Sequence, residues 1–283
     1  MPTFNIFEIL KIAEKFLTSH NITEAKLDAE VMLCDVLNIE RKVLPTIREK
    51  NLTAKQYSLY QKYLERRANR EPVSYIIGNT EFMGLKFKVS SDVLIPRQET
   101  EILVETVNNF IKKNNCKNIL DLCTGSGCIA VSVAKYNKDI SVTASDISEK
   151  ALNIAKENAE LNKVSDRINF VQSNIFESIN EKFDIIVSNP PYVTEKEYKT
   201  LEKELYFEPK LALTAEDNGL YFYKQIAENV KKYLNNNGAI FLELNANLSK
   251  EIESLFKNFS STKIIKDYSG LPRILQISTQ KEK

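Results

Sequence analysis

Histidine and glycine are both scarce in this sequence, and each shortage narrows the chemistry that the chain can perform. The only histidine is His20, so catalytic triads that depend on histidine and HExxH metal sites are excluded. His20 lies near the end of a predicted first helix, where we expect a surface residue. The 283 residues include seven glycines, and we expect them mainly where the backbone requires glycine: Gly78, Gly84, Gly125, Gly127, Gly219, Gly238 and Gly270.

The sequence also lacks long apolar runs, paired cysteines and an excess of charge. No stretch reaches the roughly 18 apolar residues of a membrane span, and the charges between Glu8 and Lys15 interrupt the pattern of a signal peptide. No membrane is therefore expected, and the net charge of +1 implies no polyanion, so no nucleic-acid substrate is expected either. The cysteines form no CxxC pair, and we expect reduced, mostly buried thiols of a cytoplasmic protein: Cys34, Cys116, Cys123 and Cys128.

Residues 4–72 have the apolar spacing that is typical of helices. Thr53 and Gln56 resemble a capping box at the start of the last of these helices. We expect that helix to end at Pro72, after a basic stretch at 66–70. These cations suit the C-terminus of a helix, and a contact with RNA or with an acidic partner is the alternative.

The rest of the chain is predicted to hold a hairpin and an α/β domain. Residues 74–94 predict a β-hairpin that links a helical domain, 1–73, to a second domain, 95–283. After a helix at 102–111, strands and helices alternate, which predicts a parallel sheet with helices on both faces. Ser148 is expected to begin a helix and Gly238 to stop one. Strands are expected at 118–123, 140–145, 168–172, 183–188, 239–245, 262–267 and 273–278, and helices at 127–136, 148–162, 217–235 and 247–258.

A glycine loop, Cys123-Thr124-Gly125-Ser126-Gly127, follows the first strand of this pattern. Gly125 permits a tight turn, and Gly127 lets the backbone approach a ligand near a helix N-terminus. No Lys-Ser/Thr pair follows, which disfavours a nucleoside triphosphate. Asp146 ends the next strand, where a carboxylate accepts hydrogen bonds from both ribose hydroxyls. The pattern predicts an adenosine-containing ligand, either NAD or S-adenosylmethionine, and a purely structural turn is the alternative.

The motif Asn189-Pro190-Pro191-Tyr192 separates these two cofactors. The prolines hold Asn189 extended at the carboxyl end of a strand, where ligands bind in open α/β sheets. An amide nitrogen is a poor nucleophile because its lone pair is delocalised. If the Asn189 oxygen and the Pro190 carbonyl accept its two hydrogens, the lone pair points at a sulfonium methyl group, without a metal. We therefore interpret Asn189, Pro190 and Tyr192 as catalytic, with a strand-ending turn, or a packing role for Tyr192, as the alternatives.

Several segments between residues 71 and 273 also resemble those of one enzyme family: Glu71–Ile76, Glu81–Leu85, Ile95–Arg97, Glu99–Glu101, the Asp121–Gly127 loop, Val187–Tyr192 and Asp267–Arg273. That family is the protein-(glutamine-N5) methyltransferases that modify class I peptide-chain release factors. The Asn-Pro-Pro-Tyr motif alone is shared with adenine amino-methyltransferases. The hairpin and Ile-Pro-Arg segments favour the release-factor enzymes.

The resemblance implies a seven-stranded, Rossmann-like class I methyltransferase domain, preceded by a small all-α domain and a hairpin linker. It implies methyl transfer from S-adenosylmethionine to the glutamine of the Gly-Gly-Gln loop, which modulates translation termination. The helical domain would recognise the release factor, and a monomer is expected. The cofactor would contact Cys123, Thr124, Gly125, Ser126, Gly127, Asp146, Asn174, Ile175 and Asn189, and the substrate would contact Arg97, Asn189, Pro190, Pro191 and Tyr192.

Three single positions and one short stretch depart from the pattern of that family. Gln98 replaces a proline, and Cys123 stands where glycine is common. Asn174 replaces an acid but keeps an oxygen that can pair with an adenine amine. Leu244-Asn245-Ala246 replaces a stretch that often contains glycine and glutamine, which puts any partner contact of that loop in question.

Two other functions stay open at this point. Methylation of adenine in DNA or RNA is disfavoured by the nearly neutral charge, because duplex binding relies on a basic face. A non-catalytic binding protein with a vestigial cofactor fold is disfavoured by the intact Asn189 and glycine loop. Arg97 either faces the cofactor or a partner, or pairs with Glu99 or Glu101. The Glu208-Pro209 segment either lines the site or begins a helix.

Overall fold

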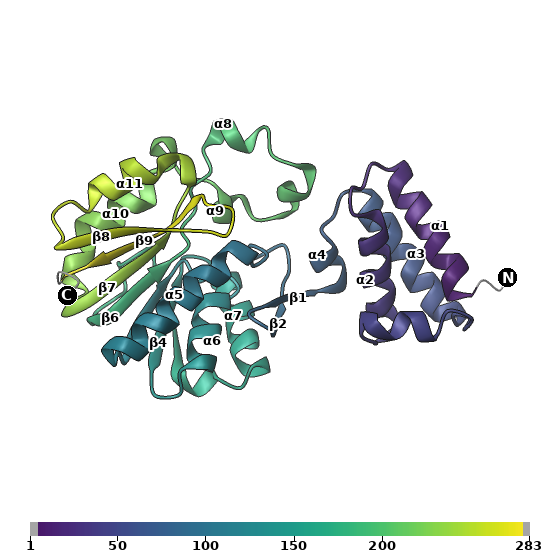
Figure 1. The fold of residues 1–283 in the computed structure, drawn as a ribbon, viewed down its shortest axis with the longest axis horizontal. Helices are drawn as coiled ribbons and strands as arrows, with labels where there is room; N and C mark the ends of the chain where they lie inside the picture. The colour runs from purple at the N-terminus through teal and green to yellow at the C-terminus, as the bar shows by residue number, and fades with distance from the viewer. Residues whose placement is uncertain (1–4, 280–283) are drawn as a thin grey trace. The chain divides into compact units, whose positions relative to one another are not determined.

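The computed structural model describes residues 5–279, which fall into two compact units. The helical unit holds the chain as far as Asn79 together with a later segment, Glu202–Phe207. The sheet unit holds Thr80–Leu201 and the chain from Glu208 onward. Figure 1 shows the helices α1 to α4 of the first unit and the layered sheet of the second. No helix within 5–279 is long and apolar enough to cross a membrane.

The helical unit packs its helices around one apolar core that includes Leu17, Leu33 and Tyr60. Tyr60 is fully buried, and its hydroxyl donates a hydrogen bond of 2.9 Å to the Ala29 carbonyl, so its polar atom is satisfied inside the core. His20 caps the first helix and is exposed, as expected. The elements are α1 (Ile6–Ser19), α2 (Ala25–Leu37), a 3-10 helix (Arg41–Thr46), α3 (Ala54–Ala68) and α4 (Val73–Ile77).

Of the two expectations about the helix α3, one is confirmed and one is wrong. The capping box of Thr53 and Gln56 is present at the start of α3. The expectation that Pro72 ends this helix is wrong, because α3 ends at Ala68 and Pro72 is instead the N-cap of α4. Proline has a fixed φ and no N–H to leave unpaired, so it suits the start of a helix. Gly78, with a φ of +74°, ends α4 in the left-handed conformation.

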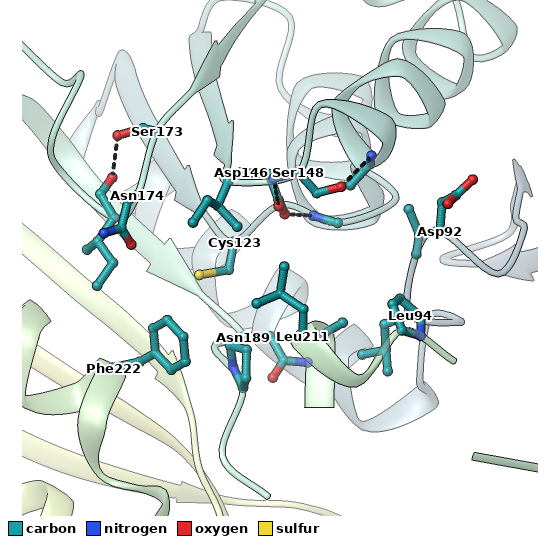
Figure 2. Close-up of a pocket in the computed structure, with 18 of the residues that line it drawn as sticks. Asp92, Leu94, Cys123, Asp146, Ser148, Ser173, Asn174, Asn189, Leu211 and Phe222 are labelled. Carbon is teal, nitrogen blue, oxygen red and sulfur yellow. Dashed lines mark hydrogen bonds between the residues drawn. The ribbon is translucent and has the colours of Figure 1, made fainter. Parts of the chain in front are cut away.

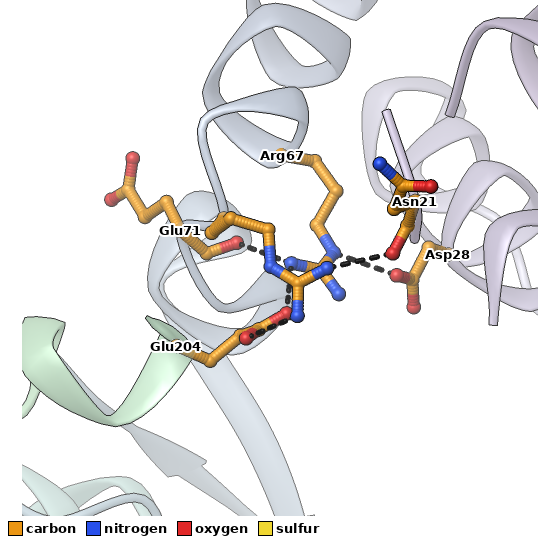
Figure 3. A network of polar contacts seen from close by, with 6 residues as sticks. Asn21, Asp28, Arg67, Glu71 and Glu204 are labelled. Carbon is orange, nitrogen blue, oxygen red and sulfur yellow. Dashed lines mark hydrogen bonds and ion pairs between the residues drawn. The ribbon is translucent and has the colours of Figure 1, made fainter. Parts of the chain in front are cut away.

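The basic end of α3 forms ion pairs inside the helical unit (Figure 3). Arg67 is buried, and its Nε lies 2.7 Å from the Asp28 carboxylate while its Nη1 lies 3.1 Å from Glu204. Arg70 reaches the other oxygen of Glu204 at 2.8 Å. Glu204 belongs to the Glu202–Phe207 segment, so these two arginines hold a distant part of the chain in this unit. These charges are therefore compensated internally.

The sheet unit has a seven-stranded mixed sheet in the order β5-β4-β3-β6-β7-β9-β8, which confirms the expected α/β fold. The first five of these strands run parallel, and β9 is antiparallel to both of its neighbours. The strands are β3 (Asn118–Leu122), β4 (Ser141–Asp146), β5 (Ile168–Gln172), β6 (Phe183–Ser188), β7 (Leu234–Glu243), β8 (Ser261–Lys266) and β9 (Pro272–Ser278). The hairpin strands β1 (Asn79–Phe82) and β2 (Leu85–Lys88) form a separate small sheet.

Helices cover both faces of the sheet (Figure 1). Residues of α5, α6 and α7 share one apolar core with the sheet and the hairpin, and residues of α10 and α11 share a second core with the other face. The helices of this unit are α5 (Gln98–Asn114), α6 (Cys128–Tyr136), α7 (Glu149–Leu161), α8 (Glu195–Tyr198), α9 (Lys210–Leu213), α10 (Tyr221–Asn229) and α11 (Ser249–Leu255).

The helix expected at 217–235 is shorter, and Gly238 does not stop it. The helix α10 ends at Asn229, and Gly238 lies inside β7. The pairing of β6 with β7 shifts register between Phe183 and Ile185, where extra residues of β7 bulge out. A Cβ at Gly238 would come within 2.6 Å of the Leu234 side chain, so the bulge leaves room only for glycine.

Candidate functional site

A pocket opens at the carboxyl ends of the parallel strands of the sheet unit (Figure 2). The glycine loop follows β3, Asp146 ends β4, Asn174 follows β5 and Asn189 follows β6. The strand β3 pairs with β4 on one side and with β6 on the other, so the chain order reverses at this point of the sheet. Ligands of open α/β sheets bind at such a reversal. Seven of the residues singled out from the sequence line this pocket: Cys123, Gly125, Asp146, Asn174, Ile175, Asn189 and Pro191.

The glycine loop makes its turn with three residues in the left-handed region. The φ angles of Cys123, Gly125 and Gly127 are +59°, +55° and +78°. Cys123 thus holds, with a side chain, a conformation that glycine adopts more easily, as its departure from the family pattern implied. A Cβ on Gly127 would lie 2.9 Å from the Ala155 Cβ, so this glycine permits the close approach of the loop to α7. Burial raises the pKa of the Cys123 thiol, which therefore stays protonated.

Asp146 holds the loop and also faces the pocket (Figure 2). Its Oδ2 accepts a hydrogen bond of 2.9 Å from the Gly125 N–H, and its Oδ1 accepts one of 2.9 Å from the Ser148 N–H. Burial raises its pKa, and the hydrogen bonds from the backbone oppose that rise. Each carboxylate oxygen keeps a further lone pair, so Asp146 can accept hydrogen bonds from a vicinal diol.

Asn174 and Ile175 follow β5 and line the pocket from that side. Asn174 Nδ2 donates to Glu177 at 2.8 Å, which leaves its oxygen as the group available to a ligand. Ile175 has a φ of +52°, which is unfavourable for a β-branched residue. The Ser173 hydroxyl donates to the Ile175 carbonyl at 3.1 Å and holds this turn (Figure 2).

The Asn-Pro-Pro-Tyr motif leaves β6 beside the end of β3. The Ser188 hydroxyl donates to the Leu122 carbonyl at 2.7 Å and joins the two strand ends. Asn189 is half-buried, and its Nδ2 donates to the Thr100 hydroxyl at 3.2 Å. Tyr192 packs against the second core, and burial raises its pKa to about 12, so its hydroxyl is neutral at physiological pH.

Several expected site residues lie outside the pocket lining. Pro190 is buried, and so are Thr124 and Ser126 of the glycine loop. The Thr124 hydroxyl donates to Asp121 Oδ2 at 2.6 Å, and burial raises the pKa of Asp121 to about 7. The structure therefore gives Thr124 an internal partner, while the pocket is reached by its neighbours in the loop.

Arg97 pairs with Glu208, so the alternative interpretation as an ion pair with Glu99 or Glu101 is wrong. Glu208 is almost fully buried and also accepts a hydrogen bond of 3.2 Å from the Ile95 N–H. Burial raises the pKa of Glu208, and Arg97 opposes that rise. The ion pair joins the start of α5 to the start of α9.

The lining includes residues that the sequence reasoning did not single out. The segment after Glu208 both begins the short helix α9 and lines the pocket, so its two alternative interpretations hold together. Tyr221 and Phe222 of α10 also line the pocket. No sequence motif marks these two residues, and only the three-dimensional fold brings them to the strand ends. Pro209, Leu211 and Ala212 are the lining residues of the segment after Glu208, and Ser148 was expected only as a helix start. The lining residues that were not singled out at all are Asp92, Val93, Leu94, Ile147, Ala151, Ser173, Tyr221 and Phe222.

Within residues 5–279 no group of three or more histidine, cysteine or acidic side chains is arranged to hold a metal ion. The cysteines are free thiols, three of them buried and Cys123 partly so, as expected.

The positions that depart from the family pattern are accommodated locally. Gln98 takes the first position of α5, where proline is also favoured, and Leu244 is fully buried in the second core.

Each of the two units matches a known protein family. Residues 8–78 match the family described as PrmC N-terminal domain, and residues 97–216 match the methyltransferase small domain. The release factor glutamine methyltransferase of Thermodesulfovibrio yellowstonii is 40% identical over 280 residues, with 97% of this chain and 98% of that protein covered. The enzyme of the same name from Flavobacterium psychrophilum is 46% identical over 218 residues, which cover 74% of this chain and 76% of that protein.

One solved structure with a similar fold is a methyltransferase of another kind. The Thermus thermophilus 16S rRNA N2 G1207 methyltransferase, solved in complex with AdoMet and guanosine, has a TM-score of 0.52 at 17% sequence identity. The match covers 71% of this chain and 50% of that one. At this identity the likeness shows the class I methyltransferase fold alone.

Proposed function

Because the chain belongs to the family of release factor glutamine methyltransferases, we propose that it methylates the side-chain amide nitrogen, N5, of a glutamine in class I peptide-chain release factors. The resemblance seen in the sequence is confirmed, and the chain is an S-adenosylmethionine-dependent methyltransferase by family and by fold. The glutamine of the Gly-Gly-Gln loop, and the consequence for translation termination in the cytoplasm, are the finer parts of this proposal. The observation that carries it is Asn189 at the end of β6, in the same pocket as Asp146.

The pocket has the groups that S-adenosylmethionine requires. Asp146 offers carboxylate oxygens for the two ribose hydroxyls, and Asn174 offers an oxygen for the amino group of adenine. Apolar side chains such as Ile147 and Phe222 provide flat walls for the base. Cys123 and Gly125 bring the loop backbone to the pocket beside these groups. When bound there, S-adenosylmethionine supplies an electrophilic methyl group on a sulfonium centre.

Asn189 and Pro190 would orient the substrate amide. Their oxygens, one from a side chain and one from the backbone, can accept the two hydrogens of a glutamine NH₂ group. This arrangement directs the nitrogen lone pair away from both acceptors. Fixed dipoles then stabilise the positive charge that develops on the nitrogen during transfer. The proton leaves after transfer, so no strong base is required. Tyr192 would close one side of this subsite.

The helical unit is the part of the chain that we propose to recognise the release factor, and we propose that the enzyme acts as a monomer. This unit matches a domain that occurs in the same family, while the catalytic pocket lies wholly in the sheet unit. The nearly neutral charge of the chain favours a protein substrate over a nucleic-acid duplex.

A labelling experiment tests the proposed substrate. The full chain is incubated with methyl-labelled S-adenosylmethionine and, separately, with a class I release factor, its Gly-Gly-Gln to Gly-Gly-Ala variant, duplex DNA and RNA. We expect label only in the parent release factor, on the glutamine amide nitrogen by mass spectrometry. Equal labelling of the Gln→Ala variant, or transfer to nucleic acid instead, contradicts the proposal.

The variant Asn189→Ala tests the orienting role within the same assay. Loss of a fixed hydrogen-bond acceptor from the reacting centre should lower kcat about 100-fold, as removal of one oxyanion-hole donor does in other enzymes. Asn114→Ala is the control, because Asn114 is an exposed asparagine at the end of α5. Turnover of Asn189→Ala equal to that of the control refutes the role.

A further inference from the structure

Asn189 begins a series of two side-chain hydrogen bonds that ends at a buried carboxylate. Its Nδ2 donates to the Thr100 hydroxyl at 3.2 Å, and that hydroxyl donates to Glu243 Oε2 at 2.7 Å. Both Thr100 and Glu243 are 2% exposed. The three residues come from three elements: the end of β6, the first turn of α5 and the end of β7.

The sheet register explains why these residues meet. Ser188 pairs with Leu242 on the adjacent parallel strand, so Asn189 and Glu243 are the next residues along neighbouring strands. Thr100 lies on the helix that starts after Arg97 and packs against β7 in the first core. The hydroxyl of Thr100 thus bridges two strand ends that are not directly hydrogen-bonded to each other through their side chains.

The charge of the carboxylate determines which group donates in each of these two hydrogen bonds. An ionised carboxylate can only accept, so the Thr100 O–H must point at Glu243. The oxygen of Thr100 then has only lone pairs left for Asn189, which must offer its NH₂ group. Because the amide nitrogen and oxygen lie in one plane on opposite sides of the Cβ–Cγ axis, the oxygen of Asn189 is turned away from Thr100.

The charge on Glu243 matters because a neutral acid would no longer fix which group donates in each hydrogen bond. A protonated Glu243 could donate to Thr100, whose O–H would then be free to donate to the Asn189 oxygen and stabilise the flipped amide. Burial raises the pKa of Glu243 to about 7, and Thr100 opposes that rise. Arg273 and Arg97 favour the charged form, whereas Glu99 disfavours it. The hydroxyls of Tyr192 and Tyr223 also face this region, and Tyr223 donates to the Glu243 backbone carbonyl at 2.8 Å.

A purely structural role does not account for a carboxylate in this place. A buried charge destabilises the fold unless it is paired, and an apolar residue of similar size would satisfy the packing. The Thr100 hydroxyl donates to the Glu243 side chain and accepts from Asn189, which lines the pocket.

We propose that Thr100 and Glu243 are positioning residues that hold the Asn189 amide with its oxygen available to the substrate. The inference rests on the proposed function, because it assigns to the Asn189 oxygen the acceptance of a hydrogen from the glutamine amide. Neither residue touches the substrate in this scheme. Their effect is on the fraction of enzyme in which Asn189 has the productive orientation.

The first test compares three threonine variants by single-turnover methylation of the release factor at saturating S-adenosylmethionine. Thr100→Val removes the hydroxyl at nearly constant volume and should lower the rate of transfer at least tenfold, while Thr100→Ser, which keeps the hydroxyl, stays within about threefold of the parent. A tenfold loss corresponds to about 1.4 kcal/mol, the size of one hydrogen bond. Thr106→Val is the matched control, because Thr106 lies on the same helix and donates only to the Ile102 carbonyl at 2.7 Å.

The second test is the pH dependence of the rate. Since the charged form of Glu243 is the directing one, the parent rate should rise with pH through about 7. Glu243→Gln cannot titrate and can accept from Thr100 through only one of its two termini, so its rate should be lower and should lose this acidic limb. An acidic limb that is unchanged in Glu243→Gln overturns the role of Glu243.

Folding and binding are measured for every variant, by thermal unfolding and by calorimetric titration with S-adenosylhomocysteine. The proposal requires a loss of rate in Thr100→Val with retained folding and cofactor affinity. A rate equal to that of Thr106→Val, or no recovery in Thr100→Ser, overturns it. If the parent enzyme labels no release-factor glutamine at all, it is the proposed function that fails, and the parent arm alone shows this.

Discussion

At the scale of single residues, Asp146 connects the shape of the glycine loop to the binding of a ligand. It accepts backbone hydrogen bonds from Gly125 and Ser148 and still faces the pocket. A carboxylate is suited to this double task, because each of its oxygens can accept more than one hydrogen bond. An amide in its place offers one oxygen and adds two donors.

We therefore expect Asp146→Asn to bind S-adenosylhomocysteine at least tenfold more weakly, because charge-assisted hydrogen bonds are worth about 1.5–3 kcal/mol. Isothermal titration calorimetry measures this affinity. Asp139→Asn is the control, since Asp139 is exposed and precedes the other end of the same strand. Equal affinities of the two variants would contradict the assignment of the ribose to Asp146.

Gly219 is a second residue on which the site depends. Its φ is +86°, and a Cβ there would lie 2.5 Å from the Tyr192 carbonyl oxygen. The glycine thus lets the segment before α10 pass directly against the Asn-Pro-Pro-Tyr motif. This contact, rather than a turn alone, explains why the scarce glycine is found here.

Gly219→Ala should lower the free energy of unfolding by about 2–4 kcal/mol, because the overlap with the Tyr192 carbonyl adds to the cost of the left-handed conformation. Gly270→Ala is the matched control: its φ is +81°, but a Cβ there would meet nothing within 4 Å. That variant should lose only about 1–2 kcal/mol. Urea denaturation of the full chain compares the two, and equal losses would show that the contact with Tyr192 is unimportant.

At the scale of elements, the helical unit depends on a segment that comes from far along the chain. Glu204, in Glu202–Phe207, pairs with both Arg67 and Arg70. Burial raises the pKa of Glu204, but its hydrogen bonds with the backbone and with these arginines outweigh burial and leave the pKa below its usual value. The lowered pKa means that ionised Glu204 stabilises this unit at neutral pH.

Glu204→Gln should therefore destabilise the helical unit by about 1–3 kcal/mol at pH 7, because Arg67 is buried and loses part of its compensation. The pKa of Glu204 is lower in the folded state than in the unfolded state. Its stabilisation of the helical unit is therefore complete above the unfolded-state pKa and is lost as the pH falls through the folded-state pKa. The difference between parent and variant should thus shrink below about pH 4. Hydrogen exchange of the α3 amides in the full chain measures it.

Glu40→Gln is the control for Glu204→Gln, because it removes a carboxylate from an exposed ion pair. Glu40 pairs with Lys42, and both side chains are more than 70% exposed, so this pair should contribute little. A loss of α3 protection in Glu40→Gln as large as in Glu204→Gln would show that the burial of the Arg67 pair is not the cause.

At the scale of the whole molecule, the order of elements could be predicted because strands and helices have different periods of apolar residues. The strands β3 to β9 lie within a few residues of their expected positions, except that β7 begins earlier, at Leu234. That error arose because three asparagines before Gly238 are typical of a helix end. Their true setting is a bulge beside β6, which depends on a neighbouring strand and leaves no local signal.

The pocket could be predicted in part for a similar reason. Residues that follow parallel strands meet at one edge of the sheet, so the loop after β3, Asp146 and Asn189 were found from their places in the chain. The segment after Glu208 was one of two open alternatives, and it does line the pocket. The aromatic residues of α10 reach the same pocket from elsewhere, and no spacing within the sequence marks their approach.

The sequence by itself determined the fold class, the family and the polar groups at the strand ends, because each of these depends on local patterns or on motifs of adjacent residues. Only the tertiary structure decided the partners of those groups: Glu208 for Arg97, Glu204 for Arg67, and Thr100 with Glu243 for Asn189. The hydrogen-bonded members of these sets are separated by 89 to 143 positions in the chain. Their pairing follows from sheet register and burial, which exist only after the chain has folded.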